Sequence, residues 1–163
     1  MPTLRRFTPA DLEAYMAVRR EGLTLDAGSF RVSPADDDAL GAEAWRARLG
    51  RDYVIGLEQN TRILGIGGFA RISGTKTQHK GLIWGMYVRA DSRGTDVAEK
   101  IMEALLAHAK DHVRHVQLTV VAHNARAVAF YERHGFMRYG VEPASIQMEN
   151  GEYVDEALMW RPI

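Results

Sequence analysis

The sequence lacks cysteine, long apolar runs and an excess of charge of either sign, and each absence excludes a class of protein. Without a cysteine among its 163 residues, the chain forms no disulfide, no thiolate metal site and no cysteine nucleophile. No apolar run reaches the roughly 18 residues that span a bilayer, and the N-terminal segment lacks the apolar stretch of a secretory signal. We therefore expect a cytoplasmic protein with no membrane partner.

The charges of the chain balance, with 21 Lys and Arg residues against 21 Asp and Glu residues. A neutral chain lacks the broad basic field that drives nonspecific nucleic-acid binding, so no nucleic-acid partner is expected. One local basic cluster, formed by Arg46, Arg48 and Arg51, is interpreted as a solvated helix face. The length is typical of one domain, which is roughly 100–200 residues, so residues 1–163 are expected to form a single domain.

The spacing of apolar residues predicts a chain in which helices and strands alternate. Helices are expected after Thr8-Pro9, ending near Gly22, and after Ser33-Pro34, ending near Gly50, because a hydroxyl N-cap followed by proline starts a helix. Two more helices are expected over residues 97–108 and 124–134, and strands over residues 3–7, 53–58, 63–72, 81–89, 116–121, 136–141 and 153–160. This order favours one mixed sheet with helices packed on its faces.

The turn over residues 90–95, between the strand expected at 81–89 and the helix expected at 97–108, has the composition of a phosphate site. The first turn of a helix has unpaired N–H groups, and the helix dipole favours an anion there. Arg93 adds a permanent positive charge, and Gly94 allows the backbone to approach a ligand closely. By itself the turn does not identify a phosphate site, because any strand-to-helix connection can contain Arg-Gly.

Two blocks of the sequence resemble the GNAT superfamily of N-acetyltransferases. The run from Leu82 to Leu106 is similar to the acetyl-CoA motif of that family, whose signature is Gln/Arg-x-x-Gly-x-Gly/Ala at a helix start. The signature reads here Arg93-Gly94-Thr95-Asp96-Val97-Ala98. Residues 121–136 resemble the family's strand–Asn–helix–Tyr–Gly-Phe block. With the matching order of elements, the resemblance covers nearly the whole chain.

The resemblance implies an α/β (α+β) fold with a central mixed, mostly antiparallel β-sheet, helices on both faces, and splayed central strands that hold the cofactor. It implies an acyl-CoA-dependent N-acyltransferase that uses acetyl-CoA as co-substrate and no metal. The backbone beside a bulge would pair with the pantetheine amides, and the helix start would cradle the pyrophosphate. The implied cofactor-binding residues are Met86, Tyr87, Val88, Arg93, Gly94, Thr95, Asp96, Val97, Ala98 and Asn124.

The implied catalytic residue is Tyr131, which would donate a proton to the departing thiolate because a phenol with a pKa near 10 is protonated at neutral pH. Tyr131 could instead be a helix aromatic packed on the sheet, and Asn124 could merely cap the helix that follows it. Asp96 departs from the family signature, which has glycine there. Its carboxylate either stabilises the helix start from outside or weakens cofactor binding by repelling the pyrophosphate.

Other titratable residues leave several roles open. Glu58, Asp155 and Glu156 are candidates for the general base that deprotonates the acceptor, although each is a common solvated strand residue. His108 and His112 stand four residues apart on a helix, but no third ligand accompanies them, so no metal site is expected.

The predicted reaction is transfer of an acetyl group from acetyl-CoA to a primary amine of a small molecule by direct attack. The acceptor pocket is expected near Phe30 and Trp84, although both residues are also candidates for the core. A protein acetyltransferase acting on an N-terminus or a lysine, and a non-catalytic acyl-CoA sensor, are the alternatives. A shallow acidic groove would favour a protein acceptor, and a closed pocket a small molecule. The family resemblance also makes a homodimer possible.

Overall fold

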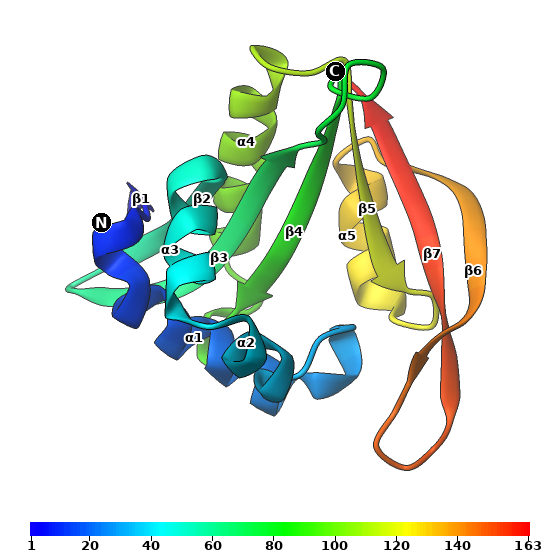
Figure 1. The fold of residues 1–163 in the computed structure, drawn as a ribbon, viewed down its shortest axis with the longest axis horizontal. Coiled ribbons are helices and arrows are strands. Elements are labelled where there is room, and N and C mark those ends of the chain that lie inside the picture. Colours follow the sequence, from blue (N-terminus) through cyan, green and yellow to red (C-terminus); the bar gives the residue numbers. More distant parts are fainter.

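The computed structural model describes all residues, 1–163, and contains one sheet of seven strands with five helices (Figure 1). The strands are β1 (Thr3–Arg6), β2 (Tyr53–Gln59), β3 (Arg62–Arg71), β4 (Lys80–Val88), β5 (His115–Val121), β6 (Met137–Gln147) and β7 (Tyr153–Pro162). The helices are α1 (Leu12–Leu25), α2 (Pro34–Leu40), α3 (Ala42–Arg51), α4 (Val97–Lys110) and α5 (Ala125–Arg133), with short 3-10 turns at Pro9–Asp11, Ala27–Ser29 and Ala90–Ser92. No helix is both long enough and apolar enough to cross a bilayer.

The strands lie in the order β1-β2-β3-β4-β5-β7-β6. Every neighbouring pair is antiparallel except β4 and β5, which run parallel at the centre of the sheet. A parallel pair needs a long crossover connection, and α4 provides it. The expected mixed, mostly antiparallel sheet is therefore confirmed.

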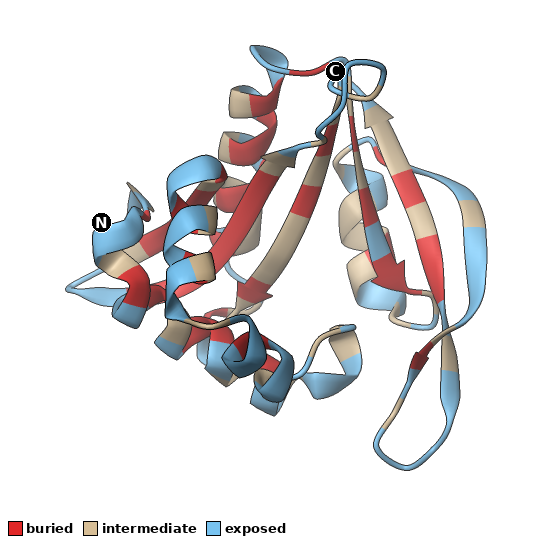
Figure 2. Ribbon diagram, viewed as in Figure 1, coloured by how far each residue is buried: buried red, intermediate tan, exposed pale blue.

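Helices cover both faces of the sheet, and each face has its own hydrophobic core. Helices α1 and α3 pack on one face around Phe7, Tyr15 and Trp45, while α4 packs on the other face through Ile101 and Leu105. Figure 2 shows the resulting pattern, in which the central strands are largely buried and the outer sides of the helices are exposed. Along β2 the side chains alternate between the two cores, as the period of a strand requires.

Two helix boundaries differ from the sequence prediction, and a glycine explains each difference. The single helix expected from Ser33 to Gly50 is two helices, because Gly41 has a φ of +86° that breaks the helical path between α2 and α3. Helix α1 continues past Gly22 to Leu25. A Cβ on Gly22 would lie 2.8 Å from the ring of Tyr87, so this glycine permits close packing of α1 on the sheet and does not end the helix.

The central parallel pair separates along its length. Hydrogen-bonded pairing joins Lys80–Leu82 of β4 to His115–Gln117 of β5 and then stops. Figure 1 shows the two strands meeting at one end and diverging toward the other. On its other edge β4 carries a bulge opposite β3, where Ile66 pairs with Tyr87 but Gly68 pairs with Trp84. Both the bulge and the splayed strands, expected from the family resemblance, are confirmed.

We predict that Gly67→Ala lowers the free energy of unfolding by about 1–3 kcal/mol, because overpacking a close-packed core costs that much. A Cβ at this position would lie 2.5 Å from Sδ of Met86 and 2.8 Å from Cγ2 of Ile101, where α4 presses on β3. Urea denaturation measures the change. Gly28→Ala, which adds a Cβ with nothing within 4 Å, is the control, and equal stability of the two variants would contradict the prediction.

Candidate active site

A cleft of about 940 Å³ lies where β4 and β5 diverge. Its walls are β4 from Leu82 to Val88, β5 from Leu118 to Val120, the start of α4, one side of α5 and the segment around Ser29 that follows α1. Beyond Leu82 the edge of β4 that faces β5 has no partner strand. The cleft is therefore bordered by unpaired backbone, to which an extended amide chain can add as a strand does.

The start of α4 presents a row of free backbone donors. None of the six N–H groups from Gly94 to Glu99 donates to a backbone carbonyl, and only that of Val97 has a side-chain acceptor, Oγ1 of Thr95 at 3.5 Å. Gly94 holds a φ of +76°, which a residue with a side chain rarely adopts. Free N–H groups at the positive end of a helix dipole form an anion site.

The side chains of this loop hold its shape. Arg93 donates from Nε to the carbonyl of Val88 at 3.1 Å, and its guanidinium lies 3.5 Å from the carboxylate of Asp26. Thr95 donates from Oγ1 to the carbonyl of Ser92 at 2.5 Å. Arg93 thus ties the end of β4 to the end of α1 and keeps its positive charge beside the free N–H groups.

Asp96 turns away from the cleft. Its carboxylate pairs with Lys100 at 2.7 Å, its side chain is 62% exposed, and it does not line the cleft. This geometry agrees with the interpretation that the acid stabilises the start of α4. Val97 is also absent from the lining, because its side chain lies in the core.

Asn124 and Tyr131 lie on the opposite wall, on and before α5. Oδ1 of Asn124 accepts a hydrogen bond from the N–H of Ala127 at 3.2 Å and so caps the helix. Its amide is not free, because Nδ2 donates to Oγ of Ser29 at 3.4 Å. The Tyr131 hydroxyl has no hydrogen-bond partner, and burial raises the pKa of this phenol to about 12. Its ring packs edge-to-face against Phe130 and Phe136, with interplanar angles of 71° and 72°, and borders the cleft.

A model of the acetyltransferase (GNAT) family matches residues 20–136, which is most of the chain. The chain belongs to the GNAT family of acetyltransferases. It is therefore an acyltransferase, and the predicted fold class and family are confirmed.

Solved structures share this GNAT fold over almost the whole chain. The acetyltransferase of GNAT family from Streptococcus pneumoniae has a TM-score of 0.84 and 22% identity, with 100% of both chains covered. The ribosomal-protein-alanine N-acetyltransferase from Brucella melitensis has a TM-score of 0.79 and 20% identity, with 99% of both chains covered. A candidate acetyltransferase from Salmonella typhimurium, solved with its cofactor acetyl-CoA, has a TM-score of 0.80 and 17% identity, covering 99% of this chain and 94% of its own. No curated protein matches the sequence.

Beyond the bulge the same cleft is lined by residues of α1, α3 and the segment after α1, and we call this part its second compartment. Phe30 and Trp84 line it, as expected for the acceptor pocket. Arg48 lines it too, which corrects the interpretation of this residue as part of a solvated face. Its guanidinium carbon lies 3.5 Å from the centre of the Trp84 ring, whereas Arg46 is exposed. Arg48 stands three residues after the buried Trp45 and therefore shares the inward side of α3.

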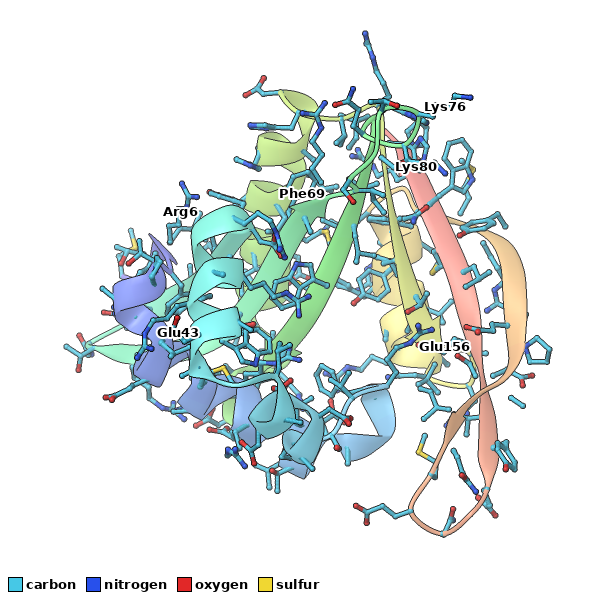
Figure 3. The ribbon with its side chains drawn as sticks, viewed as in Figure 1. Arg6, Glu43, Phe69, Lys76, Lys80 and Glu156 are labelled. Carbon is cyan, nitrogen blue, oxygen red and sulfur yellow. The ribbon has the colours of Figure 1, made fainter.

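A buried carboxylate stands on the β7 side of the GNAT cleft. Glu156 is 4% exposed and lines the cleft, and Figure 3 shows it where β7 passes the end of β5. Three groups donate to its Oε1, namely Nε of Arg31 at 3.0 Å, Nη2 of the same arginine, and Oγ of Ser145 at 2.5 Å. Oε2 accepts no hydrogen bond from the protein, so one oxygen of Glu156 is available to a ligand.

The other titratable candidates lie away from the GNAT cleft. Glu58 pairs with Arg5 at 2.6 Å, and Asp155 accepts from the N–H of Ala144 at 2.8 Å. His108 stacks on Tyr53 at 3.8 Å, and burial lowers its pKa. No group of three His, Cys, Asp or Glu side chains is arranged to hold a metal ion.

Most of the residues implied by the family resemblance come together in the GNAT cleft. Those that line it are Met86, Tyr87, Val88, Arg93, Gly94, Thr95, Ala98, Asn124 and Tyr131. Sequence reasoning missed Arg19, Arg31 and Glu99, all of which also line it. Glu99 had a visible signal, as the acid in the first turn of α4 beside the motif, and its Oε2 is buried without a partner. Arg19 and Arg31 gave no signal in the sequence, because they reach the cleft only through tertiary packing.

We predict that Asp96→Gly leaves the Kd for acetyl-CoA within about twofold of wild type, because the carboxylate points away from the cleft. Stability should fall by about 0.3–1 kcal/mol with the loss of the acid at the helix start. Isothermal titration with acetyl-CoA measures the first effect and urea denaturation the second. Gly94→Ala is the positive control. It strains the loop by about 1–2 kcal/mol and should therefore weaken acetyl-CoA binding. Clearly tighter binding by Asp96→Gly would show that the carboxylate repels the pyrophosphate.

We predict that wild type loses stability between pH 9 and pH 11 more steeply than Tyr131→Phe does. The pKa of Tyr131 is raised from 10.0 to about 12, so the unfolded phenol ionises before the folded one and the stabilisation is lost as pH rises through this range. One pKa unit corresponds to about 1.4 kcal/mol, which is the expected difference at pH 11. Urea denaturation at the two pH values tests this, and identical losses would contradict it.

Proposed function

We propose that residues 1–163 form a single N-acetyltransferase domain that transfers the acetyl group of acetyl-CoA to a primary amine of a small molecule. One observation carries the proposal. A single continuous cleft joins the free N–H groups at the start of α4, the Tyr131 phenol and the free Oε2 of Glu156. An anion site, a proton donor and a proton acceptor thus border the same space.

The cofactor would run along the unpaired edge of β4. The N–H groups from Gly94 to Ala98, with Arg93 beside them, would hold the pyrophosphate. The backbone from Met86 to Val88 would pair with the pantetheine amides, since this stretch lies beyond the last pairing with β5. Asn124 would contact the cofactor arm once Nδ2 leaves its 3.4 Å contact with Ser29. The thioester would then lie near the bulge, between the two compartments of the cleft.

The chemical step would be direct attack of the amine on the thioester carbonyl. The amine first gives its ammonium proton to Oε2 of Glu156, and its nitrogen then forms a C–N bond to give a tetrahedral intermediate. Collapse of the intermediate breaks the C–S bond, and Tyr131 donates its proton to the departing thiolate. The nitrogen, which still holds two protons after the attack, loses one of them to the resulting phenolate, so that the neutral amide and the protonated Tyr131 remain. With a pKa of about 12 the phenol is fully protonated at neutral pH, as this role requires.

The acceptor would bind in the second compartment of the cleft, which we call the acceptor compartment from here on. Its shape favours a small molecule over a protein chain. Arg31, in the segment after α1, bridges to Glu156 of β7 and to Glu142 of β6, the latter at 3.1 Å. The contact between Asn124 and Ser29 draws the same segment toward α5. These bridges narrow the cleft where a long peptide would have to pass. The lining also carries arginines where a groove for basic peptides would carry acids.

We predict that Tyr131→Phe and Glu156→Gln each lower kcat by about 10²-fold or more, the usual contribution of a positioned acid or base. Acetyl-CoA affinity should stay near wild type, because neither change touches the start of α4. Release of free CoA with a panel of small amines measures kcat, and isothermal titration measures affinity. Asp155→Asn is the matched control, since this carboxylate neighbours Glu156 on β7 but does not line the cleft.

Two results would favour the alternatives. Tight binding of acetyl-CoA without turnover of any amine or peptide would identify a non-catalytic sensor. Turnover of peptides with a free N-terminus or lysine, at rates well above those of small amines, would identify a protein acetyltransferase and require the Arg31 bridge to open.

A further inference from the structure

Three arginines and two carboxylates form a charged cluster beside the second compartment of the cleft. Asp37 pairs with Arg19 at 2.6 Å, and Asp52 is shared between Arg48 at 3.4 Å and Arg51 at 2.9 Å. The Arg51 side chain is 70% exposed and does not line the cleft, so water solvates its charge. Arg19 and Arg48 are the members of the cluster that line the cleft.

Arg48 is the member of this cluster with hydrogen-bonding capacity to spare. Its single hydrogen bond is the long one from Nε to Asp52, so both terminal nitrogens lack an acceptor in the protein. The side chain is 27% exposed and lines the cleft. Its guanidinium stacks on Trp84 at 3.5 Å and on Trp45 at 5.1 Å, which leaves its edge to face the ligand. Burial lowers the pKa of Arg48 because it penalises the charged form, and the nearby charge of Arg19 acts in the same direction while Asp52 opposes it.

Arg19, which is paired with Asp37, packs on the same two tryptophans as Arg48. Arg19 donates to both oxygens of Asp37 and is 6% exposed, so it is a rigid support. Its guanidinium carbon lies 4.6 Å from the centre of the Trp45 ring. A Cβ on Gly85 would lie 3.5 Å from its Nη1, which places the cluster beside the bulge of β4. The positive charge is therefore close to the point where the thioester would lie.

We propose that the acceptor is an amino acid, a primary amine that also carries a carboxylate, and that Arg48 binds this carboxylate. The inference rests on the proposed function. The ammonium group would meet the free Oε2 of Glu156, and the carboxylate would meet the free edge of Arg48, since a guanidinium recognises a carboxylate through two parallel hydrogen bonds.

Matched pairs of ligands test the proposal in the wild-type protein. The probes are glycine, β-alanine, 4-aminobutyrate and 6-aminohexanoate, which vary the distance between amine and carboxylate, and large-side-chain amino acids such as phenylalanine and glutamate. Each is titrated calorimetrically, with and without saturating CoA, beside its carboxamide, which keeps the amine but removes the charge. The best-binding acid should exceed its amide about 10- to 100-fold, the range for a hydrogen bond to a charged group.

Variants of α3 assign the effect to one arginine. Arg48→Gln should lower affinity for the acid about 10- to 100-fold and leave affinity for the amide within about twofold, so that the preference disappears. Arg48→Lys should keep part of the preference for the acid over the amide. Arg46→Gln, an exposed position on the same helix, should keep the wild-type preference. Circular dichroism confirms that each variant is folded.

The binding readout separates this proposal from the proposed function. Acid preference that depends on Arg48 supports the inference even if no probe is acetylated, in which case the catalytic proposal fails alone. Turnover of neutral amines or amides as efficient as that of the acids would overturn the inference and leave the acetyltransferase proposal intact. A preference for the acid that survives Arg48→Gln would also overturn the inference.

Discussion

The loss of pairing between β4 and β5 is the constraint on which the rest of this structure depends. A strand edge inside a protein leaves N–H and C=O groups without partners, which is costly unless water or a ligand satisfies them. Here the two strands pair over only three residues each before they part. The gap admits a ligand to the middle of the sheet, so the most buried layer of the protein also forms the walls of its active site.

Two features that depend on glycine shape the gap between β4 and β5 into a cleft for a ligand. The bulge on β4, where Gly85 has a φ of +64°, turns the strand beside the place where the thioester would lie. Gly67 lets α4 approach β3 closely, and this close contact directs the start of the helix toward the cleft. The anion site is therefore held by core packing as well as by the loop from Arg93 to Asp96. Bridges from Arg93 to Asp26 and from Arg31 to Glu156 close the segment after α1 over the opening.

The two ends of the cleft differ in how their charge is arranged. At the cofactor end the anion site consists mainly of backbone N–H groups, which suits a ligand common to a whole family. At the acceptor end the charge is on side chains, with Arg48 held between tryptophans and Glu156 held by Arg31. Backbone sites need little more than a glycine and a helix start, whereas side-chain sites depend on which residues the packing brings together. Specificity for the acceptor is therefore expected in the side chains.

The sequence by itself determined the element order, the family and the loop at the start of α4 that lines the cleft, because local signals carry them: strand and helix periods, turn glycines and a contiguous motif. It misjudged the end of α1 and the break at Gly41, where the role of a glycine depends on its backbone angle or on a distant ring. Only the tertiary structure decided the acceptor end. Glu58, Asp155 and Glu156 looked alike as strand acids, and Arg48 looked like its exposed neighbours. The fold separated them by bringing β7, α1 and α3, far apart in sequence, around one cleft, and burial and long-range contacts of this kind have no local signature.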